Sequence, residues 1–170
     1  MAAAYTDDEI DVITATFGKA CGSVGAFIAG KASLIQQCIQ GCRSFIYTTA
    51  LPDPVVAWNL QCLTRLQQLE ETRQVLQANA HAFRGWLVKE GVSVKGSTQI
   101  VPVIMGSSER AVTSAQYLKQ QGIWVLPIHH PTVAKGQERL RFSLTPHHTL
   151  PDLERVAHHV GVAYHMPSRA

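Results

Sequence analysis

The sequence predicts an α/β fold, and three features of its 170 residues support that class. Short runs rich in β-branched and aromatic residues alternate with longer segments whose apolar residues recur at helical spacing. Glycine and proline stand at the junctions between these segments. The composition, 46% hydrophobic and 16% charged, is that of an ordinary globular protein. The length suits one domain, or one domain together with part of another.

The first third of the chain is predicted to hold two strands and a helix. Residues 10–17 form the first strand, because β-branched and aromatic residues dominate there. Residues 23–30 form a second, short apolar strand that a glycine closes. Residues 31–42 place apolar side chains at helical spacing. Residues 43–54 are expected as an extended loop, since two prolines at its end precede the next helix.

A long helical segment is predicted next. Asp53 is expected to cap it, with Pro54 at its first position. Residues 55–91 are periodic, and a polar junction at residues 68–72 separates two apolar faces. This pattern predicts one long or broken helix that ends at Gly91.

The last part of the chain alternates between strand and helix patterns. Strands are expected at residues 99–106, 123–128 and 139–144, and helices at residues 108–121 and 150–160. In chain order these elements form a β-α-β-β-α unit, which predicts a small α/β domain.

Charge and terminal sequence argue against several classes of protein. The formal net charge is only +3, and basic residues form no long block, so nucleic acid is not an expected partner. The N-terminal stretch turns acidic within a few residues, and no apolar run is long enough to span a bilayer. We therefore expect neither a signal peptide nor a membrane anchor, and we expect a cytoplasmic protein.

Cysteine and histidine spacing predicts no metal site. The four cysteines form no C-x-x-C pair and are expected as reduced, buried thiols: Cys21, Cys38, Cys42 and Cys62. Three pairs of adjacent histidines occur at residues 129–130, 147–148 and 158–159. Adjacent residues on a strand face opposite sides, and the last pair fits the polar face of a helix.

One lysine is poorly explained by packing. Lys19 lies among small residues in "TFGKACGSVG", where the first strand breaks. By itself it could be a surface lysine that begins a turn. The surrounding glycines, however, allow a flat molecule to approach the backbone closely. A partly desolvated lysine amine can act there as a nucleophile toward an aldehyde cofactor, and Thr16 offers a hydroxyl to an anionic group.

Three motifs in order resemble a known family: "TFGKACGSVGAFIAG", "SFIYTTALP" and "GIWVLPIHHPTVAKGQERLRFSLTPHHT". Together they resemble the pyridoxal-phosphate-dependent α-oxoamine synthases, and among these they look most like the 8-amino-7-oxononanoate synthases of biotin biosynthesis. The resemblance implies the C-terminal part of a fold-type-I transferase. Residues 1–57 would be a remnant of the large cofactor-binding domain, residues 58–90 a linking helix, and residues 91–170 a small C-terminal α/β domain.

The resemblance also implies roles for individual residues. Lys19 would form the Schiff base with pyridoxal phosphate, and Thr16 would hydrogen-bond the cofactor phosphate. Thr48 and Thr49 would reach a phosphate across the interface of a homodimer. Thr132 would contact the substrate.

Arg141 would hold the carboxylate of the amino-acid substrate through two parallel hydrogen bonds. Strand geometry places Arg139 on the same face as Arg141, with Leu140 on the opposite face. Spacing alone therefore leaves both arginines as candidates, and only the resemblance favours Arg141.

The implied reaction is a decarboxylative condensation of an amino acid, expected to be alanine, with an acyl-CoA or acyl thioester, expected to be pimeloyl. The family also uses an aspartate at the ring nitrogen and a stacking histidine, both upstream of the lysine strand. Asp7, Asp8 and Asp11 are too near Lys19 in the sequence to replace that aspartate. Two alternatives stay open: an inactive truncated module that lacks this half of the site, and a glycine-using relative such as a 5-aminolevulinate or 2-amino-3-ketobutyrate synthase.

Overall fold

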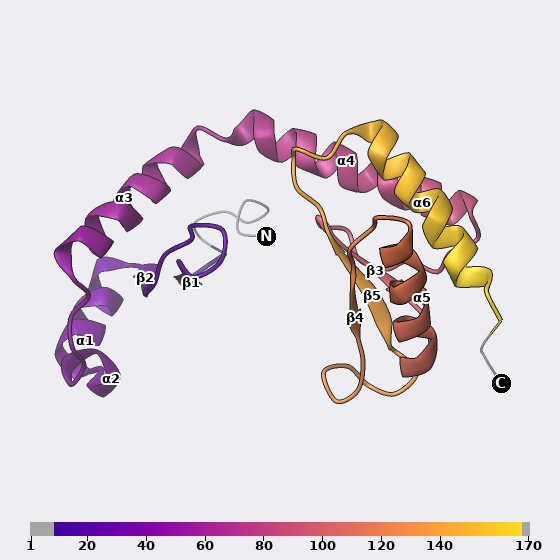
Figure 1. Cartoon of the computed structure of the whole chain (residues 1–170). Helices are drawn as coiled ribbons and strands as arrows, with labels where there is room; N and C mark the ends of the chain where they lie inside the picture. Colours follow the sequence, from indigo (N-terminus) through magenta and orange to yellow (C-terminus); the bar gives the residue numbers. More distant parts are fainter. Residues whose placement is uncertain (1–8, 168–170) are drawn as a thin grey trace. The chain divides into compact units, whose positions relative to one another are not determined.

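The computed structural model describes residues 9–167 and divides into two compact units between Leu69 and Glu70 (Figure 1). Unit 1 comprises residues 1–69 and unit 2 comprises residues 70–170. Among residues 9–167, the helices are all too short or too polar to cross a lipid bilayer.

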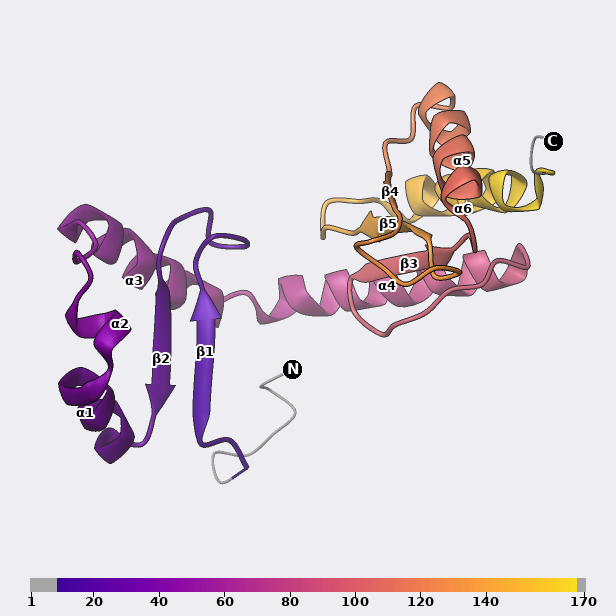
Figure 2. The same ribbon diagram turned by 90° about the horizontal axis from the view of Figure 1, so that it is seen from below.

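Unit 1 is built on an antiparallel hairpin followed by helices (Figure 2). Strands β1 (Val12–Thr16) and β2 (Ala26–Gly30) pair so that Val12 lies opposite Gly30 and Thr16 lies opposite Ala26. The helices are α1 (Ala32–Gly41), α2 (Arg43–Ile46) and α3 (Asp53–Gln67). Both predicted strands and the first predicted helix are therefore present.

Unit 1 encloses very little apolar interior. Phe17 is its single buried apolar side chain in the described part of the chain, and its ring lies 5.5 Å from that of Phe27. Large side chains such as Phe45, Tyr47 and Leu60 are exposed. A two-stranded sheet with a few helices buries too little apolar area to be independently stable.

Two local predictions in unit 1 are wrong. The expected loop begins with the short helix α2, because the amides of Phe45 and Ile46 bond to the carbonyl of Cys42 and close one helical turn. Asp53 is the first residue of α3 rather than its cap. Pro52 occupies the capping position, with φ −58° and ψ 139°, and no side chain caps the helix.

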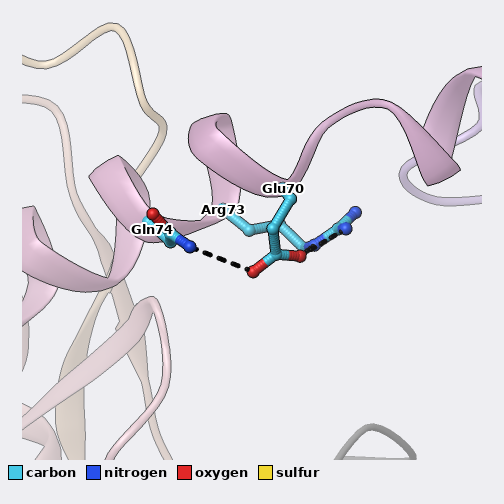
Figure 3. Close-up of polar contacts among 3 residues, drawn as sticks. All are labelled: Glu70, Arg73 and Gln74. Atoms are coloured by element: carbon cyan, nitrogen blue, oxygen red, sulfur yellow. Dashed lines mark hydrogen bonds and ion pairs between the residues drawn. The ribbon is translucent and has the colours of Figure 1, made fainter.

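The long helical segment is broken within the predicted polar junction. Helix α3 ends at Gln67 and α4 (Glu70–Lys89) begins three residues later. At the start of α4 the carboxylate of Glu70 accepts hydrogen bonds from Arg73, at 2.6 Å and 3.0 Å, and from Gln74 (Figure 3). A carboxylate in the first turn also interacts favourably with the helix dipole.

Unit 2 contains a three-stranded antiparallel sheet in the order β3-β5-β4. Its further elements are β3 (Ile100–Ile104), α5 (Ser108–Gln120), β4 (Leu126–Ile128), β5 (Arg139–Ser143) and α6 (Leu150–His165). This order is the predicted β-α-β-β-α unit, and α6 runs five residues beyond its predicted end.

The core of unit 2 lies between one face of this sheet and the helices. On β5, Leu140 and Phe142 are buried, whereas Arg141 is exposed on the other face. Phe83 of α4 is fully buried and meets the ring of Phe142 edge-on at 5.4 Å. The sheet therefore presents one apolar face to the helices and one face that carries its arginines.

Candidate active site

Lys19 lies in the turn that joins β1 to β2. The amide of Phe17 donates to the carbonyl of Gly25, that of Ser23 donates to Phe17, and that of Gly22 donates to Lys19, each at 3.0 Å. Gly22 and Gly25 have φ values of 55° and 95°, which side chains with a Cβ rarely adopt. These bonds hold the backbone of the turn in place around the lysine.

The side chain of Lys19 is exposed, as are Gly18 and Ala20 on either side of it. The partial desolvation expected from the sequence is therefore not provided by unit 1, because the residues of the turn are too small to cover a lysine. A Cβ built on Gly22 would meet no atom within 4 Å, so the space beside that part of the turn is open.

The three threonines predicted to bind phosphate are all exposed in unit 1. Thr16 is the last residue of β1, at the entrance to the lysine turn. Thr48 and Thr49 lie after α2 and before α3, and their hydroxyls bond to no other described residue. Thr16 is thus adjacent to the lysine turn in the hairpin, whereas Thr48 and Thr49 belong to a separate segment.

Helix α3 fixes the lysine turn through side chains that the sequence analysis did not single out. The indole nitrogen of Trp58 donates to the carbonyl of Cys21 at 3.3 Å, and Nδ2 of Asn59 donates to the carbonyl of Val24 at 3.1 Å. Asn59 is buried. In the sequence, the feature that could have indicated this contact is an adjacent tryptophan and asparagine on an otherwise amphipathic helix.

A cavity of about 420 Å³ lies between the lysine turn and α3. Its walls are mostly apolar and are formed by Ala20, Cys21, Trp58, Gln61, Cys62, Arg65, Leu66 and Leu69.

In unit 2 the structure separates the two arginines that strand spacing leaves equivalent. Nε of Arg139 donates to the carbonyl of Gln137 at 2.7 Å. Arg141 is exposed, bonds to no other described side chain, and borders a second cavity of about 420 Å³. His148, Asp152 and Arg155 border the same cavity. Arg141 therefore has its guanidinium available for a ligand.

Thr132 lies in a turn that follows the cis peptide bond between His130 and Pro131. Its amide donates to the carbonyl of His129 at 3.0 Å, and its side chain is exposed. Across residues 9–167, His, Cys, Asp and Glu side chains nowhere gather in a group of three that could hold a metal ion.

Comparison with known proteins identifies the family. The model of a family described as aminotransferase class I and II matches residues 2–160. The chain belongs to this family. An 8-amino-7-oxononanoate synthase of Stutzerimonas stutzeri is 41% identical over 150 residues, which cover 88% of this chain and 38% of that protein. A mitochondrial 5-aminolevulinate synthase of Agaricus bisporus is 37% identical, over 86% of this chain and 24% of that protein.

Solved structures agree with this assignment. A serine palmitoyltransferase that holds pyridoxal phosphate as an internal aldimine superposes with a TM-score of 0.80 at 30% identity, over 91% of this chain and 40% of that one. An 8-amino-7-oxononanoate synthase from Francisella tularensis superposes with a TM-score of 0.76 at 26% identity, over 89% and 45%. The predicted fold class, the C-terminal part of a pyridoxal-phosphate-dependent transferase, is confirmed.

The chain spans only about two-fifths of the curated 8-amino-7-oxononanoate synthases that it matches, 38% of the one from S. stutzeri and 41% of a putative one from Geobacillus kaustophilus. Pyridoxal phosphate is the cofactor of the family, as the motifs imply. The residues of the turn fit this cofactor. Lys19 offers an exposed primary amine, Thr16 offers a hydroxyl nearby in the hairpin, and the space beside Gly22 is open.

Proposed function

We propose that this chain is the lysine-bearing part of an 8-amino-7-oxononanoate synthase or a near relative. The whole enzyme would condense an amino acid with an acyl-CoA or acyl thioester and release CO₂ and the free thiol. The supporting observation is the match over nearly the whole chain to relatives of that name, together with the turn that presents Lys19. In its specific form, the proposal is that the amino acid is alanine, that the acyl donor is a pimeloyl thioester, and that the reaction belongs to biotin biosynthesis.

Lys19 attaches the cofactor through its primary amine. When bound, pyridoxal phosphate supplies an electron-withdrawing ring that stabilises negative charge on the Cα atom of the amino acid. When its amine is free, Lys19 would accept the proton from the Cα atom of the substrate as a general base. This role requires a backbone held in place and an accessible amine, and Lys19 lies in a hydrogen-bonded turn with its side chain exposed.

The remaining predicted residues bind and orient. Arg141 would grip the substrate carboxylate through two charge-assisted hydrogen bonds and so orient the amino acid for reaction. Thr132 contacts the substrate. Thr16 bonds the cofactor phosphate, and Thr48 and Thr49 reach the phosphate of the second subunit in a homodimer.

The predicted domain organisation belongs to the same proposal. Residues 1–57 complete the large cofactor-binding domain of the whole enzyme, residues 58–90 link the domains, and residues 91–170 form the small domain. The contact-based division between Leu69 and Glu70 falls within the proposed linking segment.

Two alternatives to this function remain. The similarity to a 5-aminolevulinate synthase favours an enzyme that uses glycine in place of alanine. The other alternative is a module that is inactive by itself, which the assay of the isolated chain tests. Both alternatives keep Lys19 as the proposed point of cofactor attachment, so substrate choice is tested separately.

The test joins this chain to the part of the S. stutzeri relative that it does not cover. The hybrid is assayed with cofactor, pimeloyl thioester and either alanine, glycine or serine, and the isolated chain is assayed in parallel. We expect decarboxylative condensation with alanine by the hybrid. Preference for glycine would favour the glycine-using enzyme instead. A correctly folded hybrid that catalyses no condensation would contradict the proposal.

Cofactor attachment is tested on the isolated chain as well. After incubation with pyridoxal phosphate and reduction by borohydride, mass spectrometry of peptides should find the label on Lys19. Lys19→Ala should lose that label, whereas Lys31→Ala, which alters another exposed lysine of unit 1, should keep it. Equal labelling of both lysines would count against a special role for Lys19.

A further inference from the structure

Two cysteines that are distant in the sequence meet beside the lysine turn. Sγ of Cys62, on α3, lies 3.7 Å from the carbonyl oxygen of Cys21, which is two residues after Lys19. Both thiols are partly exposed and free, and both line the cavity of about 420 Å³ in unit 1. The two cysteines therefore border the same space.

The surrounding contacts keep these two residues together. Trp58 donates to the same carbonyl of Cys21 that Cys62 approaches, and Asn59 holds the turn at Val24. Partial burial raises the pKa of the Cys62 thiol, and the nearby Cys21 thiol raises it further. Both causes agree with the geometry, in which the Cys62 thiol lies beside Cys21.

We propose that Cys21 and Cys62 form a reversible disulfide that locks the lysine turn to α3. Hydrogen peroxide is the oxidant. One thiol is oxidised to a sulfenic acid while peroxide is reduced to water, and the second thiol then displaces a second water to form the S–S bond. In sum, two thiols and one peroxide give one disulfide and two waters.

The bond would change how freely the turn moves. In the reduced state non-covalent contacts, including these hydrogen bonds, connect the turn to α3, whereas a disulfide would restrain the backbone on one side of Lys19. The proposal requires only the described geometry of unit 1. It does not depend on which reaction the whole enzyme performs.

Unit 1 also contains a second pair of cysteines, which serves as a control for the first. Cys38 and Cys42 lie one helical turn apart, at α1 and its C-cap, and the Cys42 thiol contacts the hydroxyl of Ser44 at 3.3 Å. That hydrogen bond lowers the pKa of Cys42, so this thiol is the more ionised competitor for peroxide. Selective bonding of Cys21 to Cys62 would therefore reflect proximity rather than general thiol reactivity.

The experiment treats the whole chain with a small excess of hydrogen peroxide, blocks the remaining thiols, and maps peptides without reduction. We expect a linked Cys21–Cys62 peptide that dithiothreitol removes. Cys21→Ser and Cys62→Ser should each abolish it, and Cys42→Ser should retain it. Hydrogen exchange should slow at the amides of Gly22 and Ser23 in the oxidised chain and return to its original rate after reduction.

Circular dichroism of each variant shows its helix content before oxidation, and hydrogen exchange within β1 and β2 shows whether unit 1 is folded. A folded chain whose thiols are consumed without the Cys21–Cys62 peptide would overturn the disulfide. If the linked peptide forms but hydrogen exchange at Gly22 and Ser23 does not change, the proposed restraint of the lysine turn is wrong. Both measurements are made without cofactor or substrate, so their failure is distinct from failure of the proposed catalytic function.

Discussion

At the scale of single residues, hydrogen bonding distinguishes side chains that the sequence leaves equivalent. Arg139 and Arg141 leave the same face of β5, but only Arg139 uses its guanidinium within the described chain, at the carbonyl of Gln137. A carboxylate ligand needs a guanidinium with free donors. Arg139 is also less exposed, whereas Arg141 keeps all five N–H donors and borders the cavity of unit 2, which favours Arg141 as the proposed substrate clamp.

Substitution of Arg141 should therefore weaken binding of the amino acid. In the active hybrid enzyme, Arg141→Gln removes charge-assisted hydrogen bonds and should raise the KM for the amino acid roughly 10- to 100-fold. Arg139→Gln is the matched control and should change this KM little. Steady-state kinetics measures both, and an equal effect of the two substitutions would leave no reason to prefer Arg141.

Glu70 gives a pH-dependent contribution at the start of α4. The hydrogen bonds from Arg73, together with its positive charge, hold the pKa of the Glu70 carboxyl below its usual value (Figure 3). Because the pKa of Glu70 is lower in the folded state than in the unfolded state, its interaction with Arg73 stabilises the helix at pH values above the unfolded-state pKa. The stabilisation is lost as the pH falls through the folded pKa.

An ordinary glutamate has a pKa of about 4.3, and an NMR titration of the Glu70 carboxyl should give a lower pKa. Arg73→Gln should move it back toward that value. Because both side chains are largely exposed, the effect on global stability should be small and should shrink at high salt. An unchanged pKa in Arg73→Gln would show that Arg73 is not its cause.

At the scale of elements, the periodic patterns predicted most helices and strands, and contacts decided where they end. Alternation of buried and exposed residues along β5 follows directly from the two-residue period of a strand. Helix α2 escaped prediction because a single helical turn has no period to detect. It is held by backbone bonds to Cys42 instead.

The packing of α4 against the sheet should dominate the stability of unit 2. Phe83 is fully buried against Phe142, so Phe83→Ala should lower the free energy of unfolding by about 3–5 kcal/mol. Val88 lies on the same helix but is 61% exposed, so Val88→Ala should cost much less. Denaturant unfolding of both variants measures the difference, and similar costs would contradict the assigned core.

At the scale of the whole molecule, the two units differ in how much interior they have. The main apolar core consists only of residues in unit 2, including Leu118, Leu140 and Val160. Unit 1 buries Phe17 as its single apolar side chain among the described residues. The proposed large domain would supply the cover that the hairpin and its helices lack.

The two units should therefore behave differently when they are produced separately. Residues 70–170 should unfold in one cooperative transition and keep dispersed NMR signals, because their core is complete. Residues 1–69 should show no cooperative transition, since they bury too little apolar surface. A cooperative unit 1, or a disordered unit 2, would contradict this division of stability.

The sequence by itself determined the order of the elements apart from α2, the β-α-β-β-α arrangement of unit 2, the family, and the position of Lys19 in a glycine-containing turn. These follow from local periodicity, from backbone conformations that glycine permits, and from motifs read in order. Only the tertiary structure decided that Trp58, Asn59 and Cys62 contact the lysine turn, and that Arg139 is engaged while Arg141 is free of other described partners. The contacts on the turn join residues 35 to 41 positions apart, and periodicity fixes the face on which a side chain lies but not what it meets there.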